Sequence, residues 1–128
     1  MGLSGTPLSQ KLGIKPDSTV VVIGDAPEGF LDGIDVRRRL GVHADVVVAF
    51  FTRRQDLEKR IDALERAIFP DAGLWIAWPK KASGVATDIT EDTLREVVLP
   101  RGLVDNKVCA IDETWSGLRL VWRKDRRH

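Results

Sequence analysis

The chain has 128 residues, 43% hydrophobic and 30% charged, which predicts one globular domain with a packed core rather than a disordered segment. Its 20 Lys and Arg residues nearly balance its 19 Asp and Glu residues, so the overall charge indicates no general affinity for nucleic acid or membranes. Cys109 is the only cysteine, which excludes an intrachain disulfide and a cysteine-based zinc site.

We expect a single domain over residues 1–128 that begins with a helical arm over 1–13, because Thr6 and Pro7 are typical of a helix start. The N-terminal segment lacks a basic and apolar leader, and no run approaches the ~20 apolar residues of a membrane helix. A cytoplasmic location is therefore expected. Residues 18–24 are mostly β-branched without polar alternation, which predicts a strand covered on both faces.

The next segment is predicted to contain a helix, with Asp25 as its N-cap and Pro27 in its first turn. As a strand, residues 34–40 would place Val36, Arg38 and Leu40 on one face and Arg37 and Arg39 on the other, which is compatible with an edge strand at best. Residues 44–51 repeat the buried-strand pattern and predict a second strand inside the sheet.

Thr52 and Gln55 have the spacing of a capping box, so we predict a helix that starts there and runs to about Phe69. Its apolar residues recur at helical spacing and predict one face that packs on the sheet. This stripe consists of Leu57, Ile61, Leu64 and Ile68.

Residues 74–78 predict a third buried strand. Thr90 is expected to cap a further helix. The segments NKVCAIDE and LRLVWRK then flank TWSG at residues 114–117, which predicts a hairpin. Residues 125–128 are expected to be a frayed tail.

This alternation predicts an α/β fold: a three-layer, Rossmann-like architecture with a mostly parallel sheet and a C-terminal antiparallel hairpin strand. Ligands bind outside the carboxyl ends of the strands in open sheets of this kind. The predicted strands end in polar or aromatic residues, so we expect a ligand-binding edge there. Its candidate residues are Lys80, Lys81, Ser83, Asp112, Glu113, Trp115 and Asp25.

Lys80 and Lys81 are candidates for holding a phosphate or carboxylate, with help from backbone amides around Ser83. The alternative is that the two lysines are solvated, or fix the hairpin in place. The chain lacks both the phosphate-loop pattern and the dinucleotide-binding fingerprint, which disfavours NAD and FAD. Cys109 fits a buried structural thiol, and the two histidines indicate neither a catalytic triad nor a metal site.

The basic cluster Arg37–Arg39 and the basic C-terminal tail are the only features that favour nucleic acid. No recognition helix or basic strand with interleaved aromatic residues accompanies them. Nucleic acid is therefore disfavoured as a partner.

Three blocks resemble the signature blocks of a small bacterial domain-of-unknown-function family that is frequent in actinobacteria. They are SGTPLSQKLGIKP, LWIAWPKKASGVATDITED and GLVDNKVCAIDETWSGLRLVWR. The resemblance covers nearly the whole chain and implies membership without an activity. The positions that match its motifs are Pro79, Lys80, Lys81, Asp88, Asp112, Glu113, Trp115 and Gly117.

The order of elements is also distantly similar to the class I S-adenosylmethionine-dependent methyltransferase fold, which has helices on both faces and ends in an antiparallel hairpin strand. This resemblance implies a glycine-rich loop after the first strand and an acidic residue for the ribose at the next strand region. The chain has GDAPEG and VRRRL at these places. A scaffold that has lost its cofactor site is therefore favoured over a working methyltransferase.

Three functions stay open. We chiefly expect a non-enzymatic cytosolic binding or regulatory domain that holds an anionic small molecule or a partner segment at the carboxyl edge. The alternatives are a minimal or degenerate S-adenosylmethionine-dependent methyltransferase-like enzyme, and a structural homodimerisation module. The sequence identifies neither a cofactor nor a catalytic residue.

Overall fold

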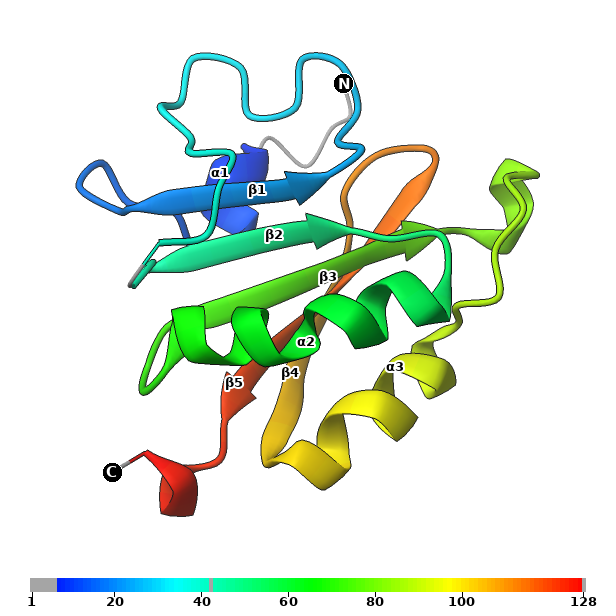
Figure 1. The fold of residues 1–128 in the computed structure, drawn as a ribbon. Helices are drawn as coiled ribbons and strands as arrows, with labels where there is room; N and C mark the ends of the chain where they lie inside the picture. Colours follow the sequence, from blue (N-terminus) through cyan, green and yellow to red (C-terminus); the bar gives the residue numbers. More distant parts are fainter. Residues whose placement is uncertain (1–6, 42, 128) are drawn as a thin grey trace.

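The computed structural model describes residues 7–41 and 43–127, and within them five strands form one sheet (Figure 1). Their order is β1-β2-β3-β5-β4. β1, β2 and β3 pair in parallel, whereas β5 is antiparallel to both β3 and β4. The α/β class and the antiparallel hairpin are confirmed, and the sheet is mixed: β5 runs opposite to the other four strands. The strand bounds are Val20–Gly24 for β1, Val46–Phe50 for β2, Gly73–Pro79 for β3, Leu103–Ala110 for β4 and Trp115–Trp122 for β5.

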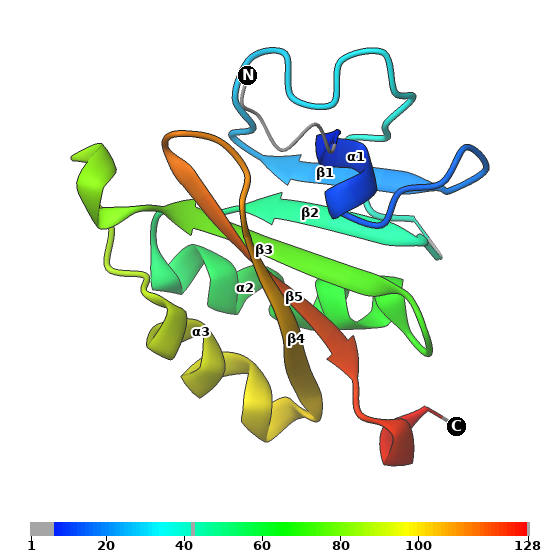
Figure 2. The same cartoon turned by 180° about the vertical axis from the view of Figure 1, so that it is seen from behind.

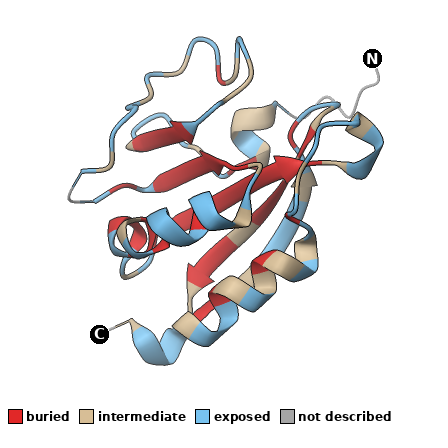
Figure 3. Cartoon of the chain, turned by 45° about the vertical axis from the view of Figure 1, so that its right-hand side comes forward, coloured by how far each residue is buried: buried red, intermediate tan, exposed pale blue. Residues whose placement is uncertain are grey.

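Two helices cover one face of the sheet (Figure 1). Helix α2 (Arg54–Ile68) packs on β2 and β3, and α3 (Glu91–Val98) packs on β4. Their outer sides are exposed, while β1, β2, β3 and most of β5 are buried and the edge strand β4 is largely exposed (Figure 3). Within the described ranges, no helix has the length and apolar character needed to cross a membrane. The predicted stripe of α2 is confirmed, because all four of its residues are buried: Leu57, Ile61, Leu64 and Ile68.

On the other face, the short helix α1 (Leu8–Lys11) lies over β1 and β2, and the irregular segment 25–41 runs at the β1 edge, from which Leu31 packs against the strands (Figure 2). Trp75 of β3 is fully buried there, and its indole Nε1 donates a hydrogen bond to the Leu12 carbonyl oxygen at 3.0 Å. This bond joins the N-terminal arm to the centre of the sheet. Because α1 has only four residues, loops replace most of a helical layer, and the three-layer prediction is not confirmed. Thr6, the predicted start of α1, lies outside the described residues.

The helix predicted after β1 is absent, and that prediction is wrong. Residues 25–34 form a loop with consecutive turns at 28–33. The backbone φ is +78° at Gly29, +55° at Leu31 and +83° at Gly33. Left-handed residues at alternate positions break the hydrogen-bond pattern of a helix. The turns bury Leu31 against the sheet and leave Asp25 exposed, without a helix to cap.

Residues 34–40 contribute a single parallel bridge, in which Arg37 pairs with Val21 at the outer edge of β1. The Arg37 N–H donates to the Val20 carbonyl oxygen at 2.8 Å, and the Val22 N–H donates to the Arg37 carbonyl oxygen at 2.8 Å. The prediction of an edge strand at best is confirmed.

Helix α2 is capped from outside its own segment, so the predicted capping box of Thr52 and Gln55 is wrong. The N-cap residue Arg53 makes no side-chain cap, and the Arg54 N–H donates instead to Asp88 Oδ1 at 2.8 Å. A distant carboxylate therefore takes the place that the local threonine was expected to fill. The predicted cap of α3 is confirmed, since Thr90 Oγ1 accepts a hydrogen bond from the Thr93 N–H at 3.2 Å.

The hairpin turns at residues 111–114, so its predicted turn at 114–117 is wrong. Asp112 Oδ1 accepts hydrogen bonds from the Thr114 and Trp115 N–H groups at 2.8 and 2.7 Å. These bonds close the turn three residues earlier than predicted, because the Asp112 carboxylate accepts from the backbone amides two and three residues ahead of it. β5 can therefore begin at Trp115.

The last described residues belong to the segment that was predicted to fray. After α3, the 3-10 turn η2 (Leu99–Arg101) leads into β4, and a second 3-10 turn, η3 (Lys124–Arg126), follows β5. Arg127 Nε donates to the Trp122 carbonyl oxygen at 2.9 Å. His128 lies outside the described residues.

Replacing Asp88 with alanine is expected to lower the free energy of unfolding by about 1 kcal/mol, because the Arg54 N–H loses its capping acceptor. Urea unfolding followed by circular dichroism measures this change. Gln55→Ala is the matched control: Gln55 is exposed in the first turn of the same helix, and its replacement is expected to change stability by less than about 0.5 kcal/mol. Equal destabilisation by the two substitutions would contradict the distant cap.

Candidate functional site

The carboxyl ends of four strands lie at one edge of the sheet (Figure 1). β4 is antiparallel to β5, and β5 is antiparallel to β3, so β4 runs in the same direction as β1, β2 and β3. This arrangement brings together the loops that follow β1, β3 and β4. The seven predicted site residues are all in these loops or at the start of β5: Asp25, Lys80, Lys81, Ser83, Asp112, Glu113 and Trp115.

Lys80 binds the hairpin turn through both its backbone and its side chain. Its N–H donates to the Thr114 carbonyl oxygen at 2.8 Å, and its Nζ donates to the Asp112 carbonyl oxygen at 2.7 Å. The Asp112 carboxylate is used in turn by the backbone of the hairpin. The lysines were expected to bind a ligand, to be solvated or to fix the hairpin. The contacts of Lys80 fit the third of these roles.

Ser83 also serves the local backbone. Its Oγ donates to the Lys80 carbonyl oxygen at 2.6 Å and accepts from the Val85 N–H at 3.2 Å, which closes the 3-10 turn η1 (Lys81–Ser83). The exposed side chains of Lys81, Asp25 and Glu113 have no hydrogen-bond or ion-pair partner among the described residues. The predicted residues thus lie at one edge of the sheet, and only some of their side chains are hydrogen-bonded within the described part of the protein.

Trp115 is 8% exposed and belongs to a row of three aromatic rings. Its ring meets Phe50 edge to face with centroids 5.0 Å apart, and Phe50 meets Phe30 in the same way at 5.0 Å. Such contacts stabilise the packing beyond burial alone. The row joins β5, β2 and the loop after β1, and it forms apolar walls for two cavities.

The first of these, which we call the edge cavity, has a volume of about 280 Å³ and lies at the ends of β1 and β2. Its charged lining residues come from two elements: Asp25 follows β1, whereas Asp56, Lys59 and Arg60 lie on α2. Phe50, Phe51, Thr52 and Trp115 supply the remaining side-chain surface, with Ile23 and Gly24. The edge cavity therefore combines both signs of charge with aromatic walls.

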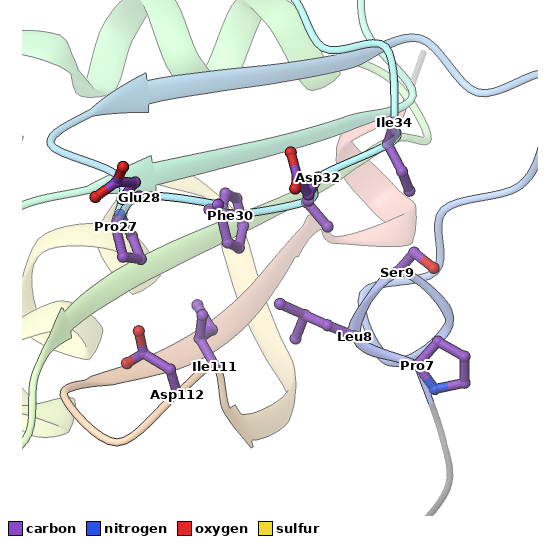
Figure 4. Close-up of a pocket in the computed structure, with 12 residues that line it drawn as sticks. Pro7, Leu8, Ser9, Pro27, Glu28, Phe30, Asp32, Ile34, Ile111 and Asp112 are labelled. Carbon is purple, nitrogen blue, oxygen red and sulfur yellow. The ribbon is translucent and has the colours of Figure 1, made fainter.

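The second, the loop cavity, has a volume of about 390 Å³ and lies between α1, residues 27–34 and the hairpin turn (Figure 4). Leu8, Phe30 and Ile111 supply apolar surface from these three parts of the chain. Its charged lining residues are all acidic: Glu28, Asp32 and Asp112.

Gly24 ends β1 in a conformation that only glycine adopts readily. Its φ is +88°, and a Cβ at this position would lie 2.3 Å from the Phe50 carbonyl oxygen. One guanidinium nitrogen of Arg38 donates to the Gly24 carbonyl oxygen at 3.2 Å. The close approach of β2 therefore excludes a side chain at position 24. Arg38 thus lies at the end of β1.

Several lining residues were not predicted as site residues. Lys59 and Arg60 belong to the charged face of α2, which the periodicity assigns to solvent. Leu8 and Phe30 are apolar, partly buried residues that pack against the core, and they carry no polar group that would mark a site. The strand–helix–strand crossover, which places the start of α2 at the carboxyl edge, is the signal that points to Lys59 and Arg60.

Neither metal chemistry nor a reactive thiol is indicated at this edge. In residues 7–41 and 43–127, no group of three His, Cys, Asp or Glu side chains could hold a metal ion. Cys109 is partly buried in β4, and burial raises the pKa of its thiol. The protonated form is favoured at neutral pH, which suits a structural thiol better than a nucleophile.

No protein-family model and no curated protein sequence matches the chain. Solved structures do. An S-adenosylmethionine-dependent methyltransferase from Aquifex aeolicus has a TM-score of 0.63 at 15% identity, over 88% of this chain and 86% of that chain. A putative type 11 methyltransferase from Sulfolobus solfataricus has a TM-score of 0.57 at 13% identity, over 86% and 74%. The ribosomal protein L11 methylase from Lactobacillus delbrueckii subsp. bulgaricus has a TM-score of 0.57 at 13% identity, over 91% and 75%.

At these identities the likeness establishes the fold, which is the Rossmann-like α/β fold of methyltransferases. The predicted distant similarity to that fold is confirmed. The resemblance of the three sequence blocks to a domain-of-unknown-function family is supported by no family model and stays a prediction.

Lys80→Ala is expected to lower the free energy of unfolding by about 1 kcal/mol, because the Asp112 carbonyl loses a charged donor. Lys81→Ala is the matched control, since Lys81 is exposed at the next position, and we expect a change below about 0.5 kcal/mol. Urea unfolding of the two variants tests this difference. If Lys81→Ala lowers the free energy of unfolding as much as Lys80→Ala does, the hydrogen bond from Lys80 Nζ to the Asp112 carbonyl oxygen does not explain the loss.

Proposed function

We propose that this chain is a minimal methyltransferase-like enzyme that binds S-adenosylmethionine in the edge cavity. The observation that carries the proposal is the position of a cavity with mixed charge and aromatic walls at the carboxyl ends of β1 and β2. Ligands bind at this edge in open α/β sheets. The fold is also one that the solved methyltransferase structures share.

The lining residues fit the amino-acid tail of S-adenosylmethionine. That tail carries an ammonium group, a carboxylate and a sulfonium, and the edge cavity offers both signs of charge. Asp25 and Asp56 suit the ammonium group and the sulfonium, whereas Lys59 and Arg60 suit the carboxylate. Phe51 and Trp115 offer apolar surface for the adenine ring. When bound, this ligand supplies an electrophilic methyl group.

The lining does not offer the carboxylate that the family resemblance implies for the ribose. The strand region next to β1 has Arg37–Arg39 there, and the Arg38 guanidinium contacts the end of β1. We therefore expect the tail to contribute most of the affinity. Asp25 is exposed and has no described partner, so it can hold the ligand without first breaking a bond of its own.

The two other functions predicted from the sequence have less support. Lys80, a main residue of the anionic-ligand hypothesis, is bound to the hairpin. For the homodimer, the outer edge strand β4 has a register shift between Asp105 and Lys107. Irregularities and lysines in edge strands disfavour pairing with another strand.

Isothermal titration calorimetry with three ligands tests the proposal. S-adenosylmethionine and S-adenosylhomocysteine are expected to bind with dissociation constants below about 1 mM, and adenosine, which lacks the tail, at least about tenfold more weakly. Asp25→Asn and Arg60→Ala are each expected to raise the dissociation constant of S-adenosylmethionine about fivefold to tenfold. Asp17→Asn and Arg123→Ala are matched controls outside the edge cavity. Absence of binding, or equal losses in the controls, would contradict the proposal.

Transfer of a labelled methyl group separates an enzyme from a binding domain. The protein is incubated with methyl-labelled S-adenosylmethionine and a metabolite extract, and labelled products are sought by mass spectrometry. We expect a product that the Asp25→Asn variant forms more slowly, because this variant binds the methyl donor less well. Tight binding with no labelled product would refute the enzymatic part of the proposal.

A further inference from the structure

We propose that the loop cavity is a second ligand site, which takes a small amine with an apolar body. This cavity shares no lining residue with the edge cavity. Its volume of about 390 Å³ lies in the range of small-molecule sites, which are mostly apolar with a few polar groups. The inference therefore stands apart from the proposed binding of S-adenosylmethionine.

The apolar part of the cavity is built from three separate segments (Figure 4). Leu8 comes from α1, Phe30 from the loop after β1, and Ile111 from the hairpin turn, and the close-up shows them around a common space. Pro27 and Ile34 extend this surface along the loop. Removing an aromatic or aliphatic ligand body from water on this surface is favourable.

The charge of the lining selects the head group. Glu28 and Asp32 lie on the loop, and Asp112 lies opposite them on the hairpin turn (Figure 4). Among the described residues that line the cavity there is no lysine, arginine or histidine. These carboxylates make the electrostatic potential of the cavity negative, so a cation is attracted and an anion is repelled. The cavity therefore favours an ammonium group over a hydroxyl, and a hydroxyl over a carboxylate.

The carboxylates differ in how freely they can bind. Asp112 is fixed by the Thr114 and Trp115 N–H groups, so its charge has a defined position at the cavity. Glu28 and Asp32 are exposed, and their side chains have no ion-pair or hydrogen-bond partner among the described residues. A ligand can therefore use these two without displacing a bond that stabilises the fold.

Methyl-resolved NMR titration with three probes of equal body size tests the site: phenethylamine, the neutral 2-phenylethanol and the anionic 3-phenylpropanoate. We expect phenethylamine to shift the methyl signals of Leu8, Ile34 and Ile111, and to bind about tenfold more tightly than the alcohol. Ile61 and Ile68 of α2, on the opposite face, are the reference signals. Added salt is expected to weaken the binding of phenethylamine and to leave the binding of 2-phenylethanol unchanged.

The double variant Glu28→Gln and Asp32→Asn is expected to bind phenethylamine about as weakly as the alcohol. The double variant Asp17→Asn and Asp35→Asn is the matched control, because both aspartates are exposed and lie outside the loop cavity. Equal affinity for the three probes, shifts confined to the reference signals, or no binding of the amine would overturn the inference. Since S-adenosylmethionine is absent from this titration, its outcome is independent of the edge cavity.

Discussion

The position of β3 between a parallel and an antiparallel neighbour is the constraint on which the carboxyl edge depends. All seven residues of β3 are buried, and the strand pairs with β2 on one side and with β5 on the other. Its end at Pro79 faces Trp115, and Lys80 extends the contact to the turn beyond. The hairpin is thereby held beside the loops of the parallel strands: Trp115 at the start of β5 lines the edge cavity, and Ile111 and Asp112 of the turn line the loop cavity.

Much of the fold follows from local patterns. The buried strands come from uninterrupted apolar runs, and the contact face of α2 comes from its helical spacing. The errors have non-local or conformational causes. Asp88 caps a helix that starts 34 residues earlier in the chain, a contact that no local pattern contains. The loop after β1 depends on the left-handed conformation of Leu31, which amino-acid preferences disfavour.

The sequence predicted where the candidate residues lie in the sheet better than it predicted what each side chain does there. The rule for open α/β sheets places Lys80, Ser83 and Asp112 at the carboxyl edge, where the structure has them, but it does not tell whether a polar side chain is already hydrogen-bonded within the protein. Here all three are bonded to nearby backbone groups. Lys59 and Arg60 illustrate the reverse case: they have the pattern of a solvated helix face and lie at a cavity because of the crossover.

The two faces of the sheet differ in how they are held together, and this bears on how the molecule opens. The start of α2 is bonded to the segment before α3 by Asp88 and by Thr87 Oγ1, which donates to the Thr52 carbonyl oxygen at 2.7 Å. Arg54 adds ion pairs to Glu58 and Glu96. The two helices are therefore expected to exchange their amide hydrogens as one cooperative unit. The opposite face has turns and a four-residue helix in place of such bonded helices, so its amide hydrogens are expected to exchange at a lower opening free energy than those of the helical face.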